Sequence, residues 1–134
     1  MEPITLHRWF RPWSYGIGHS QLVLHADADS SDNEHIDVLF EDVRAVKLGG
    51  SYRPLILEPA DPDTRAGVLA FAQIPVRHQA RYLCLTLPKP DAEPGFILCA
   101  RATVLASETS NPRHHPVRNE QARVLHLLKH EPAT

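Results

Sequence analysis

The stretch RYLCLTLPKPDAEPGFILCARATVLA (residues 81–106) carries the clearest structural signal in the sequence. Leucine alternates with other residues over Arg81–Leu87, a second apolar run covers Phe96–Ala106, and the eight residues between them include three prolines and a glycine. Two such runs, joined by turn-forming residues, predict an antiparallel β-hairpin. If the leucines of the first strand pack with Phe96 of the second, Cys84 and Cys99 lie opposite each other on neighbouring strands and stay reduced.

The rest of the chain repeats this pattern of short apolar runs and breaks. Twelve prolines and six glycines interrupt the sequence, which excludes long helices from most of it. Together with the hairpin, the apolar runs predict about eight strands, of which the other six are Ile4–Phe10, Gln21–Ala26, His35–Phe40, Ala45–Leu48, Tyr52–Glu58 and Gly67–Ile74. A slip in the alternation predicts a bend or bulge at Glu41-Asp42. We therefore expect a mainly β fold, an antiparallel barrel or sandwich of about seven to eight strands.

The C-terminal part of the chain predicts a different element. A polar loop over 107–116 leads to Pro116, a residue that suits the first turn of a helix. We expect that helix to cover 116–130 and to end before Pro132. A β-barrel closed at one end by a C-terminal helix resembles the layout of pleckstrin-homology-like domains.

The same helix would bury one face against the core and expose the opposite face to solvent. Its apolar stripe, expected to be buried, consists of Val124, Leu125 and Leu128. His126 and His130 are spaced one turn apart, as in many metal sites, but they fall on the opposite face and lack a third ligand. We expect this histidine pair to face solvent without binding metal.

Composition and charge restrict the class of protein. The 134 residues suit a single globular domain over 1–134. A net charge of −2 with scattered basic residues argues against a nucleic-acid partner, and neither a membrane span nor a secretory signal is visible. Two cysteines are too few for a disulfide scaffold, so we expect a cytoplasmic protein. Eleven arginines against three lysines indicate a GC-rich bacterial genome.

No segment contains a complete catalytic or cofactor-binding motif. An Asp-x-Asp step at Asp27 begins like a calcium-binding EF-hand loop, but Asp32 and Val38 stand where that loop needs glycine and glutamate. The segment Asp27–Glu34 is therefore expected to be a polar hairpin connection. Cys84 lies in an apolar strand, where a thiol is not activated. We expect no catalytic residue, no metal and no cofactor.

The densest aromatic cluster lies near the N-terminus. Both tryptophans and a tyrosine alternate there with arginines, and these residue types dominate protein-binding hot spots. The candidate binding residues of this segment are Arg8, Trp9, Arg11, Trp13 and Tyr15. We expect Trp9 to be a core residue of its strand and Trp13 to be the more exposed ring. The alternative is that these rings only fill one end of the fold.

Two segments carry a resemblance to a protein family: YGIGHS (residues 15–20) and NEHIDVLFEDVRAVKL (residues 33–48), which contains a Phe-x-x-Val-x-x-Val-x-Leu strand. The first half of the chain thereby resembles small β-rich bacterial proteins grouped with the immunity proteins of polymorphic toxins. Such proteins commonly carry a His-Asp-Ser-like step, matched here by His19 and Ser20 without the Asp. The resemblance implies a non-catalytic protein that occludes a toxin, and it adds these two positions to the candidate binding residues.

Three classes of function remain. The first is a non-enzymatic, immunity-type module that binds a protein partner. The second is a β-barrel that carries a small molecule or lipid, which requires a large apolar internal pocket. The third is a metal-dependent enzyme, which requires three histidine or carboxylate side chains that converge at metal-binding distance.

Overall fold

The computed structural model describes residues 1–16, 20–30, 32–108 and 122–130. In these residues the chain forms ten strands, one α-helix and one 3₁₀ helix. The elements are β1 (Ile4–Leu6), β2 (Arg11–Gly16), β3 (Gln21–Ala26), β4 (His35–Glu41), β5 (Ala45–Lys47), β6 (Leu55–Pro59), α1 (Pro62–Phe71), η2 (Val76–Arg81), β7 (Leu83–Leu87), β8 (Gly95–Cys99), β9 (Arg101–Ser107) and β10 (Arg123–Lys129).

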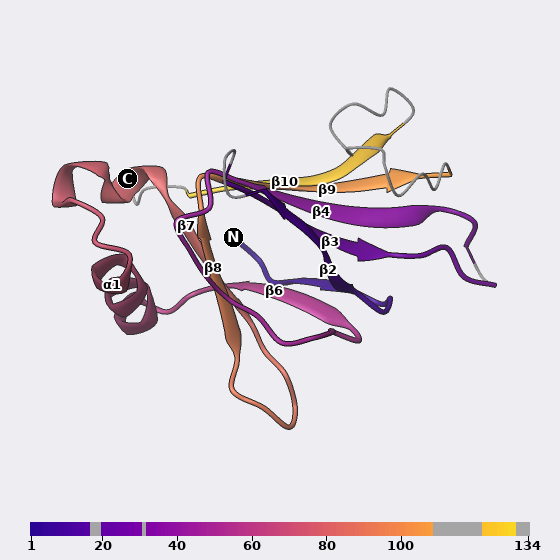
Figure 1. Ribbon diagram of the computed structural model, residues 1–134, viewed down its shortest axis with the longest axis horizontal. Helices are drawn as coiled ribbons and strands as arrows, with labels where there is room; N and C mark the ends of the chain where they lie inside the picture. Colours follow the sequence, from indigo (N-terminus) through magenta and orange to yellow (C-terminus); the bar gives the residue numbers. More distant parts are fainter. Residues whose placement is uncertain (17–19, 31, 109–121, 131–134) are drawn as a thin grey trace.

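The strands form two antiparallel sheets, which confirms the sandwich. One sheet has the order β1-β6-β7-β8-β5 and the other β10-β9-β4-β3-β2. The sheets are not closed into a barrel, and β7 and β8 cross β4 and β9 steeply (Figure 1). Apolar residues at every second position of the central strands face the other sheet, so that Leu22, Leu24, Val38, Phe40 and Leu85 share one buried core.

The two sheets are joined at a corner, where two neighbouring stretches of chain each bend and pass from one sheet into the other. The sequence predicts a single strand over Phe96–Ala106, but the chain bends at Ala100 between β8 and β9. Beside it, β4 passes into β5 through Asp42, whose φ of 54° confirms the bend predicted there. Ala100 donates its N–H to Glu41 at this corner. Strands that switch sheets through bends of this kind are typical of steeply crossed sandwiches.

The helix α1 replaces the strand predicted over Gly67–Ile74, and that prediction is wrong. Asp61 caps the helix by accepting the Thr64 N–H at 2.8 Å, and a proline follows in the first turn. Val68 and Leu69 then pack on Cys84 and other residues of the first sheet's outer face. An apolar run of this length suits a strand or a helix, and the capping signal decides for the helix.

The C-terminal helix predicted over 116–130 is also wrong where the structure describes it. Residues 123–129 form β10, an edge strand paired with β9. Val124 and Leu125 are exposed, and only Leu128 of the predicted stripe is buried. A bulge between Val124 and His126 shifts the strand's alternation, which is why the apolar spacing imitates a helix. The predicted loop 107–116 lies outside the described residues from position 109 onward, and the helix of the pleckstrin-homology-like layout is replaced by this strand over 123–129.

The hairpin at residues 81–106 has a register that differs from the prediction by one residue. Leu83 pairs with Cys99 and Leu87 with Gly95, so Cys84 and Cys99 lie on adjacent strands but on opposite faces. Gly95 explains the shift, because a Cβ there would lie 2.5 Å from the Lys47 carbonyl oxygen. Only glycine fits this inward position, which turns Phe96 to the outer face.

Both thiols are free and buried, and we expect neither to react in the native protein. Burial raises the pKa of Cys84 to about 11 and that of Cys99 to about 12. Since thiolates are the nucleophiles, iodoacetamide at about pH 8 should leave both cysteines unmodified, as mass spectrometry would show. The control is the same reaction in guanidinium chloride, where both should be alkylated. Modification of native Cys84 at the rate of the unfolded thiol would contradict this.

Candidate functional site

Exposed aromatic rings gather around the edge strand β2. Trp9 is 51% exposed, Trp13 38% and Tyr15 48%. The Arg11 guanidinium lies 5.1 Å from the centre of the Trp9 ring and 5.3 Å from that of Trp13, which is cation–π range. We call Trp9, Arg11 and Trp13 the aromatic–arginine surface. The candidate residue Tyr15 is not part of it, because it pairs with the core residue Leu22 and therefore lies on the other face of β2. The prediction that Trp9 is a core residue and Trp13 the more exposed ring is wrong: Trp9 is the more exposed of the two, because the neighbouring Phe10 takes the buried position.

Arg8 binds the loop between β3 and β4, and its side chain contributes little exposed surface. Its side chain is buried and donates to the carbonyl oxygens of Asp27 at 2.9 Å and Glu34 at 3.0 Å. Its guanidinium also forms ion pairs with Asp29 at 3.3 Å and Asp32 at 2.8 Å. Every one of these groups belongs to the connection between β3 and β4, which is the polar hairpin connection expected over Asp27–Glu34. Arg8 therefore holds that connection against the sandwich.

Next to this loop, His25 lies between two carboxylates. Its Nδ1 is 2.6 Å from Asp37 Oδ1 and its Nε2 is 2.9 Å from Asp27 Oδ1. Burial by itself lowers the pKa of His25, but the hydrogen bonds and charges of Asp37 and Asp27 outweigh it and raise the pKa above its usual value. The hydrogen bond to His25 lowers the pKa of Asp27, which also accepts from Arg11 at 3.0 Å.

A second histidine completes the cluster. His35 stacks on His25 with ring centres 5.6 Å apart. The centre of the Trp13 ring, on the neighbouring strand β2, lies 4.5 Å from that of His25. One ligand atom from each of His25, Asp27 and His35 lies within 4.8 Å of the other two. These residue types at this separation are those that hold a divalent transition metal. The cluster therefore touches the aromatic–arginine surface through Trp13 and Arg11.

Sequence reasoning missed this cluster, although a signal for it exists. The chain contains His-x-Asp twice, at His25 and at His35, on the two arms of one hairpin. Because His25 pairs with Asp37, all four side chains emerge on the same outer face. Helix-type spacing instead pointed to His126 and His130, and these lie on and just after β10, away from any third ligand in the described residues.

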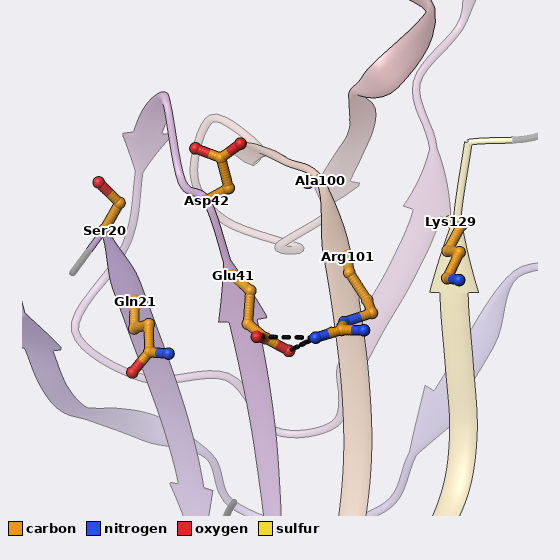
Figure 2. A pocket seen from close by; sticks show the side chains of 7 residues that line it. All are labelled: Ser20, Gln21, Glu41, Asp42, Ala100, Arg101 and Lys129. Atoms are coloured by element: carbon orange, nitrogen blue, oxygen red, sulfur yellow. Dashed lines mark hydrogen bonds and ion pairs between the residues drawn. The ribbon is translucent and has the colours of Figure 1, made fainter.

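The remaining candidate binding residues lie elsewhere. His19 is outside the described residues, and Ser20 sits at the opposite end of β3 from His25. Ser20 lines a surface depression of about 480 Å³ at the corner of the sandwich, shown in Figure 2. In it Arg101 of β9 donates two hydrogen bonds to Glu41 of β4, at 2.9 and 2.8 Å, with Lys129 beside them. The structure thus unites Arg8, Trp9, Arg11 and Trp13 around the histidine cluster and separates Ser20 from them.

Comparison with known proteins does not assign the chain to a family. No protein-family model matches the chain, and neither a curated protein nor a solved structure shows significant similarity to it. Among the described residues, no helix has both the length and the apolar character needed to cross a lipid bilayer.

Proposed function

We propose that this chain is a non-enzymatic module that binds a protein partner through the aromatic–arginine surface. The observation that carries the proposal is the exposure of Trp9 and Trp13, whose rings both lie against the Arg11 guanidinium at the edge strand β2. Large exposed rings cost solvation free energy in a free protein, so an exposed group of them favours a role in binding. Tryptophan, tyrosine and arginine are also the residue types that supply most of the binding energy at protein interfaces.

The surface is held in place before any partner arrives. Arg11 is fixed by its ion pair with Asp27 at 3.0 Å and lies against both tryptophan rings. Trp13 rests on the buried His25 ring. Side chains that are already ordered lose less conformational entropy on binding, which favours affinity. The half-exposed carboxylates of Asp29 and Asp32 beside this surface favour a partner with basic residues at the rim.

The finer version of this proposal is an immunity-type protein whose partner is a bacterial toxin. Its support is the sequence resemblance over residues 15–20 and 33–48, which include the end of β2 and the whole of β4, two strands of the sheet that carries the aromatic–arginine surface. We further propose that it acts in the reducing cytoplasm, where its two free cysteines would remain reduced.

The two alternative classes receive less support. A carrier of small molecules needs an apolar interior pocket, whereas the sandwich interior is filled by side chains such as Tyr52, Phe10 and Phe40, which are almost fully buried. His25, Asp27 and His35 meet the ligand condition stated for a metal-dependent enzyme, but such an enzyme also needs a substrate pocket beside its ligands. Neither the corner depression nor a smaller one of about 180 Å³ is lined by His25, Asp27 or His35.

The test of this proposal is partner capture with matched variants. The Trp9→Ala/Trp13→Ala double variant should lose a partner that wild type retains, with affinity falling by about 2 kcal/mol or more per hot-spot residue. The control is Phe71→Ala, which removes another exposed aromatic ring from α1 on the far side of the first sheet. A protein encoded beside this gene is the first candidate, measured by calorimetry and by rescue of growth from its toxicity. Equal binding by wild type and the double variant would refute the proposed surface.

A further inference from the structure

We propose that His25, Asp27 and His35 form a binding site for a divalent first-row transition metal, with Zn²⁺ as the representative ion. The inference is independent of the proposed protein partner, because it concerns the side chains beneath the aromatic–arginine surface. The three residues come from β3, from the loop that follows it and from β4. Two imidazoles and one carboxylate are a donor set that zinc accepts in proteins, with a fourth position left to water.

The positions of the ligand atoms suit such an ion. Zinc lies about 2.0–2.1 Å from nitrogen and oxygen ligands, so at tetrahedral angles two ligand atoms are roughly 3.3 Å apart. Asp27 Oδ1 lies 2.9 Å from His25 Nε2 and 3.7 Å from His35 Nδ1, on either side of that value. Small side-chain rotations therefore suffice to place an ion between them. Asp27 is half-exposed, which gives the ion a route of entry from solvent.

Asp37 supplies the group that a zinc-binding histidine needs on its other nitrogen. With its Oδ1 at 2.6 Å from His25 Nδ1, Asp37 holds the proton on that nitrogen, so that Nε2, which lies 2.9 Å from Asp27 Oδ1, is the nitrogen that would release its proton and bind the ion. A carboxylate in this position orients the imidazole and makes it a better ligand. Asp37 is thus a positioning residue of the site. Its place beside His25 results from the hairpin register that pairs the two residues.

The charge around the site also favours a cation. The hydrogen-bonded and ion-paired groups here comprise five carboxylates and three guanidinium groups, namely Asp27, Asp29, Asp32, Glu34 and Asp37 with Arg8, Arg11 and Arg123. With neutral histidines, their sum is −2, which a divalent ion neutralises. Three contacts oppose binding: His25 Nε2 shares a hydrogen bond of 2.9 Å with Asp27 Oδ1, Arg11 occupies Asp27 Oδ2, and the Ala28 N–H donates to His35 Nδ1 at 3.1 Å. The ion has to replace the first and the third of these hydrogen bonds, and the proton on His25 Nε2 leaves to solvent. The second contact still leaves Oδ1 available.

The experiment is a metal titration of the whole chain after treatment with a chelator. We expect calorimetry at about pH 7 to show one Zn²⁺ per chain with a Kd in roughly the micromolar range or below. His35→Gln and His25→Gln should each weaken binding at least about tenfold, and Asp37→Asn by about 10–100-fold. The control, His126→Gln, removes an exposed histidine from β10 and should bind as wild type does. Circular dichroism of each metal-free variant shows whether it is folded.

A second measurement keeps the proposal testable if the variant of the buried His25 does not fold. Co²⁺ bound to the wild type should give the visible absorption of a four- or five-coordinate site, and the His35→Gln variant should lack it. No bound ion, or equal affinity in wild type and His35→Gln, would overturn the site. An unchanged affinity in folded Asp37→Asn would overturn the role assigned to that carboxylate.

Discussion

Replacing Phe10 with alanine is expected to lower the free energy of unfolding by about 3–5 kcal/mol, the usual cost of removing a buried aromatic ring. Phe10 is 0% exposed and lies where the chain passes from β1 in one sheet to β2 in the other. Its backbone exchanges two hydrogen bonds of 2.8 Å with Tyr52, so the ring cannot easily shift to fill the space. Urea unfolding followed by tryptophan fluorescence measures the change. Since total stabilities of small domains are about 5–15 kcal/mol, the variant should be close to unfolding.

The matched control for this prediction is Trp9→Ala, one residue earlier. Trp9 is half-exposed and its described ring contact is the Arg11 guanidinium. Its loss should cost less than about 1 kcal/mol, the worth of an exposed cation–π contact. A larger loss for Trp9→Ala than for Phe10→Ala would mean that the tryptophan, and not the phenylalanine, occupies the core.

Replacing Arg8 with methionine is expected to cost about 2–4 kcal/mol, because two backbone carbonyls lose a charged donor and two ion pairs disappear from a buried side chain. The methionine keeps most of the apolar stem and so isolates the contribution of the guanidinium. For a domain of this size the melting temperature should fall by roughly 6–20 °C. Amides of the β3–β4 connection should also exchange with solvent faster, which hydrogen-exchange mass spectrometry detects.

Arg11→Met is the control for Arg8→Met, since it removes an arginine from the same segment. Arg11 is partly exposed, and it forms an ion pair with the half-exposed Asp27. Exposed pairs of this kind contribute about 0–1 kcal/mol, so this variant should remain nearly as stable as wild type. Equal losses for the two variants would refute the distinction between a loop-binding arginine and a surface arginine.

Residues with strict local patterns were predicted well from the sequence. Gln21–Ala26 was predicted as a strand with the bounds of β3, and His35–Phe40 stops one residue short of the end of β4. In both, apolar and polar residues alternate, and that alternation reports directly which face is buried. The candidate site was anticipated only in part. The exposed rings and their arginine were visible as composition, but the histidine cluster depends on a pairing across the hairpin.

The sequence by itself determined that this is a mainly β protein with short strands, because proline and glycine breaks and period-two alternation act within a few neighbouring residues. Tertiary structure decided the rest. Residues 123–129 become a strand because β9 offers a free edge, although their spacing suits a helix. The register of the hairpin at 81–106 follows from the space that Lys47 and Tyr52 leave at Gly95. Likewise, His25 meets Asp37 only because β3 and β4 pair in one register, and a contact of that kind joins residues whose order in the chain does not reveal their distance in space.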